Sequence, residues 1–257
     1  SSRLIAGIKG STGRHTMRNL QILAAGSLRD VWKMLMTAFH AESGLTANTQ
    51  YGPAGLLRQR IEQGEICDLF VSANLQHPEK LRQQGLADHT GHFTNNRLCL
   101  TAKRDCVIEQ DDWLSLLLRE DLRLGTSTPL CDPSGDYTLQ LFDHIEQRHP
   151  GCGDALRQRA IAMVGGPDSL PVPAGDLAAQ WIINAGHAEL FIGYASYAPR
   201  LARFSQLRVF NIPSAYNVQA RYGWATLSAA ARPLAAFLSS DTAQQILRQY
   251  GFLSLSQ

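Results

Sequence analysis

Long hydrophobic runs are absent from this 257-residue sequence. No stretch of about 18 uninterrupted apolar residues occurs, and the best candidate, residues 225–238, is interrupted by Arg232 and Pro233. We therefore expect no membrane insertion. Residues 1–17 are polar and glycine-rich, without the apolar core of a signal peptide. We expect residues 1–18 to be a tag-like or disordered leader. The protein is then either exported, with its signal removed, or cytosolic with Met17 as its first residue.

An excess of charge of one sign is also missing. The 24 lysines and arginines are spread among 22 aspartates and glutamates, which gives a net charge of +2. Proteins that bind nucleic-acid backbones usually concentrate basic residues on one face or segment. The sequence therefore predicts no nucleic-acid partner, while its weak positive balance is compatible with a small anionic ligand.

Signatures of metal centres and of common enzymes are lacking. The five cysteines form no CxxC pair, so they indicate no zinc site. They are either free thiols or, in an exported protein, members of one or two disulfides. No GxSxG elbow, P-loop, HExxH or GxGxxG motif in context occurs. We expect a non-enzymatic protein without a cofactor and without a protein-bound metal.

Alternating strand and helix signals are what the sequence does contain. Residues 20–25 form an apolar run that ends at Gly26-Ser27, and a helical pattern follows and stops at Gly44. A second strand, a turn at residues 52–55, a helix and a third strand come next. This alternation predicts an α/β fold with a parallel sheet. Ligands bind such sheets where strands end and helices begin, so Ser27 is a candidate site residue.

A series of short motifs in a fixed order resembles the periplasmic molybdate-binding proteins, a branch of the type II periplasmic binding proteins. The resemblance extends from about residue 20 to residue 252, and each motif alone is weak. The motifs that carry it are AAGSL (24–28), YGPAGLLRQRIEQG (51–64), CDLFVSA (67–73), KLRQQGL (80–86), NNRLCL (95–100), DPSGDY (132–137), LFIGYASYA (190–198) and QQILRQYGF (244–252).

The resemblance implies a fold of two α/β lobes joined by a two-strand hinge. Lobe 1 would comprise residues 19–101 and 207–257, and lobe 2 residues 102–206. The ligand would lie in the cleft, and the lobes would close over it by hinge bending. The implied function is the capture of molybdate or tungstate for a membrane permease of an ABC importer, by a periplasmic and monomeric receptor.

The family's ligand contacts fall on five residues. Ser27 would donate its N–H and its hydroxyl, Ala54 and Ser134 would donate N–H groups, Asp176 would donate an N–H at a helix start, and Tyr194 would donate its phenolic hydroxyl. Such neutral donors, several of them at helix N-termini, bind an oxyanion without a counter-cation. Ala54 stands where the family has a serine.

Two of these residues leave the identity of the ligand undecided. Ala54 cannot offer a hydroxyl, and an ionised Asp176 would repel a dianion and, as an N-cap, compete for its donors. Of these two roles for Asp176, we favour the structural N-cap over the ligand contact. The alternatives are therefore a receptor of the same fold for sulfate, phosphate, an organic anion or a metal, and a cytosolic ligand sensor.

Overall fold

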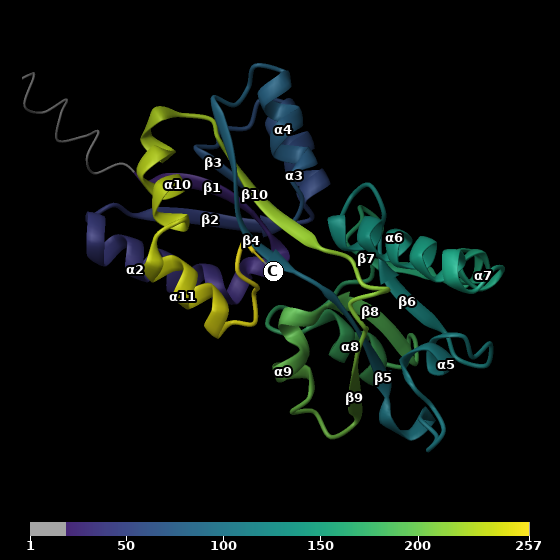
Figure 1. Ribbon diagram of the computed structural model, residues 1–257. Coiled ribbons are helices and arrows are strands. Elements are labelled where there is room, and N and C mark those ends of the chain that lie inside the picture. The colour runs from purple at the N-terminus through teal and green to yellow at the C-terminus, as the bar shows by residue number, and fades with distance from the viewer. Residues whose placement is uncertain (1–18, 257) are drawn as a thin grey trace, which may run out of the picture.

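The computed structural model describes residues 19–256, which form two α/β lobes, each built on a five-stranded sheet (Figure 1). The expected fold class is confirmed. The expected leader, residues 1–18, lies outside the described residues. Four short 3-10 helices join larger elements: η1 (Gly26–Leu28), η2 (Arg104–Cys106), η3 (Ala195–Tyr197) and η4 (Ala229–Ala231).

The first lobe combines the N-terminal part of the chain with its C-terminal end. Its elements are β1 (Leu20–Ala25), α2 (Arg29–Ser43), β2 (Ala47–Gly52), α3 (Ala54–Glu62), β3 (Leu69–Ser72), α4 (Gln76–Gln83), β4 (His89–Asn96), β10 (Ala220–Thr226), α10 (Arg232–Leu238) and α11 (Asp241–Gln249). The strand order is β2-β1-β3-β10-β4. Helices α2, α10 and α11 cover one face of the sheet, and α3 and α4 cover the other (Figure 1).

The second lobe is formed by the middle of the chain. Its elements are β5 (Leu98–Lys103), α5 (Trp113–Leu117), β6 (Leu124–Ser127), α6 (Pro133–Arg148), α7 (Cys152–Arg159), β7 (Ile161–Val164), α8 (Ala178–Asn184), β8 (Leu190–Tyr194), α9 (Ala198–Leu201) and β9 (Leu207–Asn211). The strand order is β7-β6-β8-β5-β9.

Both sheets are mixed, whereas the sequence pattern predicted a parallel sheet. In the first sheet β10 runs antiparallel to β3 and β4, and in the second β5 runs antiparallel to β8 and β9. The remaining pairs are parallel. The antiparallel strands are those that the chain enters or leaves as it passes between lobes, so no strand-helix-strand crossover fixes their direction.

The passage between the lobes lies elsewhere than the sequence indicated. The expected division at residues 101 and 207 would cut β5 and assign β9 to the first lobe, but both strands pair within the second sheet. The chain therefore crosses near Arg97 and returns between Asn211 and Ala220. The Asn217 side chain joins the two crossings, since its amide bonds both the N–H and the carbonyl of Leu98 at 3.0 and 2.9 Å.

The first strand and helix fold as their residues dictate. The strand β1 is almost entirely buried, as its unbroken apolar sequence requires in a sheet covered on both faces. Helix α2 ends at Gly44, which adopts a left-handed conformation with φ of 73°. The turn between them, η1, holds Ser27 at the carboxyl end of β1.

Candidate functional site

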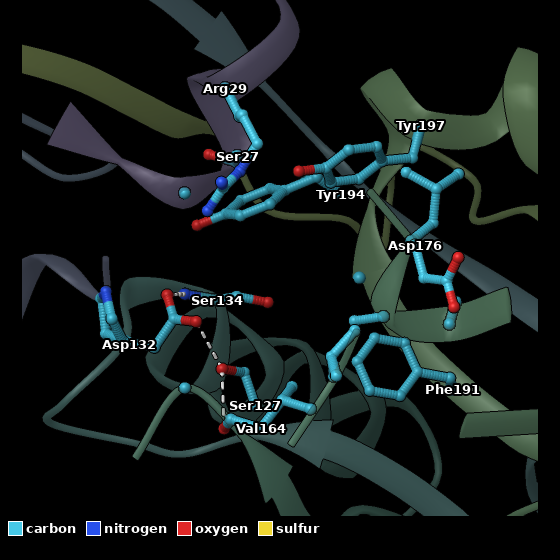
Figure 2. Close-up of a pocket in the computed structure, with 18 of the residues that line it drawn as sticks. Ser27, Arg29, Ser127, Asp132, Ser134, Val164, Asp176, Phe191, Tyr194 and Tyr197 are labelled. Atoms are coloured by element: carbon cyan, nitrogen blue, oxygen red, sulfur yellow. Dashed lines mark hydrogen bonds between the residues drawn. The ribbon is translucent and has the colours of Figure 1, made fainter. Parts of the chain in front are cut away.

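A cavity of about 550 Å³ lies between the two lobes (Figure 2). Its volume is in the range of pockets that hold small molecules. The first lobe lines it with two strand-to-helix turns, β1 to α2 and β2 to α3, through Ala25, Gly26, Ser27, Arg29, Asp30, Gly52 and Pro53. The second lobe supplies the rest of the wall. The cavity therefore lies at the carboxyl ends of parallel strands, where the sequence predicted a ligand site.

Ser27 lines the cavity, but its hydroxyl already has a partner, and its role as a ligand contact stays a prediction. Its Oγ lies 2.7 Å from the hydroxyl of Tyr222, on β10. The Asn96 amide donates to the same Tyr222 hydroxyl at 3.3 Å and to Ser196 Oγ at 2.9 Å. Burial raises the pKa of Tyr222, so the phenol is neutral. Ser27 is therefore at the end of a hydrogen-bond chain that reaches the crossing between the lobes.

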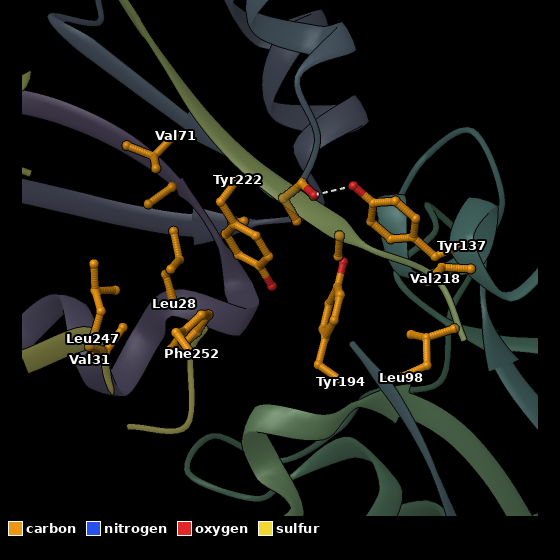
Figure 3. Packing of buried hydrophobic residues seen from close by; sticks show 14 of the residues in the cluster. Leu28, Val31, Val71, Leu98, Tyr137, Tyr194, Val218, Tyr222, Leu247 and Phe252 are labelled. Carbon is orange, nitrogen blue, oxygen red and sulfur yellow. Dashed lines mark hydrogen bonds between the residues drawn. The ribbon is translucent and has the colours of Figure 1, made fainter. Parts of the chain in front are cut away.

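Tyr194, the last residue of β8, lines the cavity with a buried phenol. The residue is 5% exposed, and its hydroxyl has no hydrogen-bond partner among the described residues. The rings of Tyr137 and Tyr222 flank it at centroid distances of 6.5 and 5.9 Å (Figure 3). Burial raises its pKa well above that of an ordinary tyrosine, so the phenol keeps its proton. A buried donor without an acceptor costs about 1–3 kcal/mol, which a ligand oxygen would recover.

Asp132 lines the cavity and was missed by the sequence reasoning. It is the N-cap of α6 and accepts hydrogen bonds from the Ser127 hydroxyl at 2.5 Å and from the Ser134 N–H at 3.3 Å. Burial raises the pKa of its carboxyl group. The signal was present in the sequence, because Asp followed by Pro is a typical N-cap and N1 pair. Helix α6 consequently begins at Pro133.

Ser134 is buried and lines the cavity, and its N–H donates to the Asp132 carboxyl group, so its predicted role as a ligand donor stays a prediction. It lies in the first turn of α6, not in the expected loop. Its side chain comes from the second lobe, on the opposite side of the cavity from Ser27 (Figure 2). The residue can offer its hydroxyl, while its backbone donor is already engaged by a carboxylate.

Asp176 also lines the cavity, but in a different role from the one expected. It is exposed, and its N–H bonds the Pro173 carbonyl at 3.1 Å within the turn. The N-cap of α8 is Leu177, and the cap makes no side-chain hydrogen bond. The expectation of a capping Asp176 is therefore wrong. In Figure 2 its carboxylate points away from Ser27 and Ser134.

Ala54 is fully buried at the first position of α3 and is not among the residues that line the cavity. Its neighbours Gly52 and Pro53 line the cavity instead. The sequence pattern placed Ala54 in the turn at residues 52–55, two residues before the expected helix start at Leu56, whereas α3 begins at Ala54 itself. Its role as a ligand donor stays a prediction.

Arg29 is a cation that the sequence reasoning did not single out. It is the first residue of α2, lines the cavity and makes no ion pair among residues 19–256. Its guanidinium lies 4.8 Å from the centre of the Tyr51 ring. Its charge partly offsets the effect of burial on the pKa of Tyr197, a second cavity tyrosine. A guanidinium beside a helix N-terminus attracts an anion.

The lobes touch each other directly beside the cavity. The Gly55 N–H of α3 donates to the Cys131 carbonyl at 2.8 Å, and the Tyr137 hydroxyl donates to the Ala73 carbonyl at 2.6 Å (Figure 3). Asp30 and Arg200 form an ion pair across the same boundary. Backbone and side-chain contacts of this kind hold the two lobes closed around the cavity.

The distribution of histidines, cysteines and carboxylates in the described part of the chain bears on metal binding. No group of three or more histidines, cysteines, aspartates or glutamates there is placed to hold a metal ion. The five cysteines are free thiols: Cys67, Cys99, Cys106, Cys131 and Cys152. None of the helices between residues 19 and 256 combines the length and apolar character that a bilayer crossing requires.

Known proteins resemble this chain in sequence and in fold. A Pasteurella multocida protein is 46% identical over 236 residues, which cover 91% of this chain and 98% of the relative. The periplasmic molybdate-binding protein of Azotobacter vinelandii has the same fold, with a TM-score of 0.73, 20% identity, and coverage of 91% and 99% of the two chains. The sulfate-binding protein of Mycobacterium tuberculosis has a TM-score of 0.76, 17% identity, and coverage of 92% and 87%. Residues 20–253 match the model of one family, and this chain therefore belongs to the bacterial extracellular solute-binding proteins.

Proposed function

We propose that this protein is the solute receptor of an ABC importer and that it captures a small anion in the cavity between its lobes. The observation that carries the proposal is the Tyr194 hydroxyl, a buried donor with no partner among the described residues, in the wall of a cavity that both lobes form. The family and the fold are those of substrate-binding transport proteins.

The chemistry around Tyr194 suits an anion. Ser27 lies at the N-terminal end of α2, where backbone N–H groups and the helix dipole favour negative charge. Arg29 adds a full positive charge at the same turn. Because the cavity is partly enclosed, each of these interactions is stronger than it would be in bulk water.

Molybdate and tungstate are the first candidate ligands, through the resemblance to the molybdate-binding proteins. Ser27, Ser134, Asp176 and Tyr194 all line the one cavity, which supports this assignment. After release of the ligand to a membrane permease, the lobes would open. We place this cycle in the periplasm.

A second candidate is an anion of lower charge, and Asp132 favours it. Its carboxyl group lies in the cavity wall and shares the Ser134 N–H that an oxyanion would use. An ionised Asp132 repels a dianion more strongly than a monoanion, because the Coulomb energy scales with the product of the charges. Sulfate, phosphate and organic anions are the remaining candidates.

Thermal unfolding in the presence of anions tests the proposal. A ligand at 100 times its Kd stabilises the folded protein by about 2.7 kcal/mol. We expect the Tm to rise with at least one anion among molybdate, tungstate, sulfate, phosphate and small carboxylates, with chloride at equal ionic strength as the control. An unchanged Tm with molybdate and tungstate would exclude the first candidates, and an unchanged Tm with every anion would exclude anion capture.

The cellular location requires its own test, because a cytosolic ligand sensor would share the fold. Fractionation of cells that express the natural gene from its own promoter distinguishes the two. We expect the protein in the periplasmic fraction; recovery with the cytosolic proteins would favour the sensor.

A further inference from the structure

The cavity has an apolar wall that an inorganic oxyanion does not need. This wall belongs to the second lobe and comprises Val164, Leu170, Val172, Pro173, Leu177, Phe191 and Leu201. Figure 2 shows Val164 and Phe191 across the cavity from Ser27 and Arg29. Arg29 and the turn at Ser27 therefore lie on one side of the cavity. The aliphatic and aromatic side chains lie on the other side, together with Ser127, Asp132 and Ser134.

The size of the cavity also exceeds that of a tetrahedral oxyanion. Four oxygens, each comparable with a water molecule whose share of liquid volume is about 30 Å³, occupy roughly 120 Å³. The cavity measures about 550 Å³. An inorganic oxyanion beside Ser27 and Arg29 would leave the space along the apolar wall filled with water that makes few hydrogen bonds, which is unfavourable.

The charges around the cavity limit the charge of its occupant. Arg29 is the one lining cation without an ion pair among the described residues. Asp30 is paired with Arg200, while Asp132 and Asp176 add carboxyl groups to the wall. The Asp176 carboxylate is exposed and points away from Ser27 and Ser134. One available cation in the same wall as the Asp132 carboxyl group favours a singly charged anion over a dianion.

We propose that the ligand is a small organic acid with a single negative charge and an apolar group of several carbons. Its charged group binds at Ser27, Arg29 and Tyr194, and its apolar group packs against Val164 and Phe191. This proposal rests on the proposed function, the capture of an anion by the cavity, and it names the class of that anion.

A series of carboxylates of increasing length tests the proposal by titration calorimetry. Acetate, butyrate and hexanoate keep the head group constant, and molybdate, tungstate and phosphate are titrated in parallel. Affinity should rise about fourfold for each methylene group that becomes buried. Hexanol, which has the tail without the charge, should bind at least tenfold more weakly than hexanoate.

The outcomes separate this proposal from the one on which it rests. Tighter binding of the longer acids supports both. Binding of molybdate or tungstate with no gain from tail length overturns the organic-acid proposal and leaves anion capture intact. Binding of hexanol as tight as that of hexanoate, or absence of binding by every anion, overturns both.

A pair of variants locates the apolar group. Ala174 lines the cavity from an exposed turn, so Ala174→Trp fills the space along the apolar wall without disturbing a packed core. Hexanoate affinity should fall at least tenfold relative to acetate affinity. The matched control is Ala155→Trp, at an exposed position of α7 outside the cavity wall, which should leave both affinities unchanged. Equal losses for the two acids in Ala174→Trp would contradict the proposed position of the apolar group.

Discussion

The two lobes line one cavity in different ways. The first lobe contributes turns: the backbone around Ser27, the Arg29 cation and the Gly52-Pro53 corner. The second lobe contributes a helix start with its Asp132 cap, a buried tyrosine and most of the apolar wall. The first lobe thus provides the attraction for negative charge, and the second lobe determines which negative ligand fits.

A substitution that prevents closure of the two lobes should have the largest effect on ligand affinity. A side chain at Gly55 would collide with the main-chain carbonyls of Leu130 and Cys131, the latter 2.7 Å from an added Cβ. Overpacking of this kind costs about 1–3 kcal/mol. Gly55→Ala should therefore weaken ligand binding by up to about a hundredfold, measured as Kd, and increase the radius of gyration in small-angle scattering.

The control for closure is Gln59→Ala, on the exposed side of the same helix α3. It should leave both Kd and the radius of gyration unchanged. Normal binding by Gly55→Ala would show that the Gly55 contact is dispensable for closure.

Removal of the Tyr194 hydroxyl should have the second largest effect on ligand affinity. Tyr194→Phe deletes a hydroxyl that has no partner among the described residues, so the unliganded protein should keep or slightly increase its free energy of unfolding. A hydrogen bond to a charged ligand is worth about 1.5 kcal/mol or more. Binding should weaken roughly tenfold. Measuring both the ligand-free Tm and the Kd of this variant distinguishes a donor that binds the ligand from one that stabilises the fold. A large loss of Tm without a change in Kd would refute the assignment of the Tyr194 hydroxyl as a ligand donor.

The pH dependence of binding should report on Asp132. Burial raises its pKa in the folded protein, and the carboxyl group of Asp136 raises it further. A group whose pKa is raised on folding favours the folded state below that pKa, and this contribution is lost as the pH rises through it. The same protonation removes a negative charge that faces the ligand, so anion affinity should rise as the pH falls.

The measurement should use an alkyl sulfonate, whose own charge is constant over the range of the titration. Asp132→Asn should bind it several-fold more tightly at neutral pH and show a flatter pH profile. Asparagine is as good an N-cap as aspartate, so α6 should be preserved. An unchanged pH profile in this variant would assign the titration to another group.

Asp176 should have the smallest effect. Its carboxylate is exposed and points away from Ser27 and Ser134. Exposed charges contribute about 0.2–1 kcal/mol. Asp176→Asn should therefore tighten anion binding by no more than about fivefold, with a smaller change at high salt. A larger gain would show that the carboxylate faces the ligand in solution.

The sequence was sufficient for the fold class because its apolar runs and glycine stops are local signals. The strand β1 and the helix start after Ser27 were predicted within a residue or two. The lobe boundary was misplaced, since the partners of β5 and β9 depend on long-range pairing that no local pattern encodes. The direction of β10 was missed for the same reason.

The candidate site was predicted in part. Ser27 and Tyr194 lie at the ends of strands in two different sheets. The sequence pattern pointed to Ser27, and the family resemblance added Tyr194 and the cleft between lobes that both residues line. The Asp132 cap could have been recognised from its Asp-Pro pair. The partner of the Ser27 hydroxyl could not, because Tyr222 is distant in sequence and joins it only after β10 has paired with β3.

The contact between the lobes uses main-chain atoms, and this has an evolutionary consequence. The Gly55 N–H and the Cys131 carbonyl exist whatever side chain follows at position 131. Leu130, beside it, is 82% exposed. Side chains at the rim of the cleft can therefore diversify during evolution while the same main-chain contact continues to close the lobes.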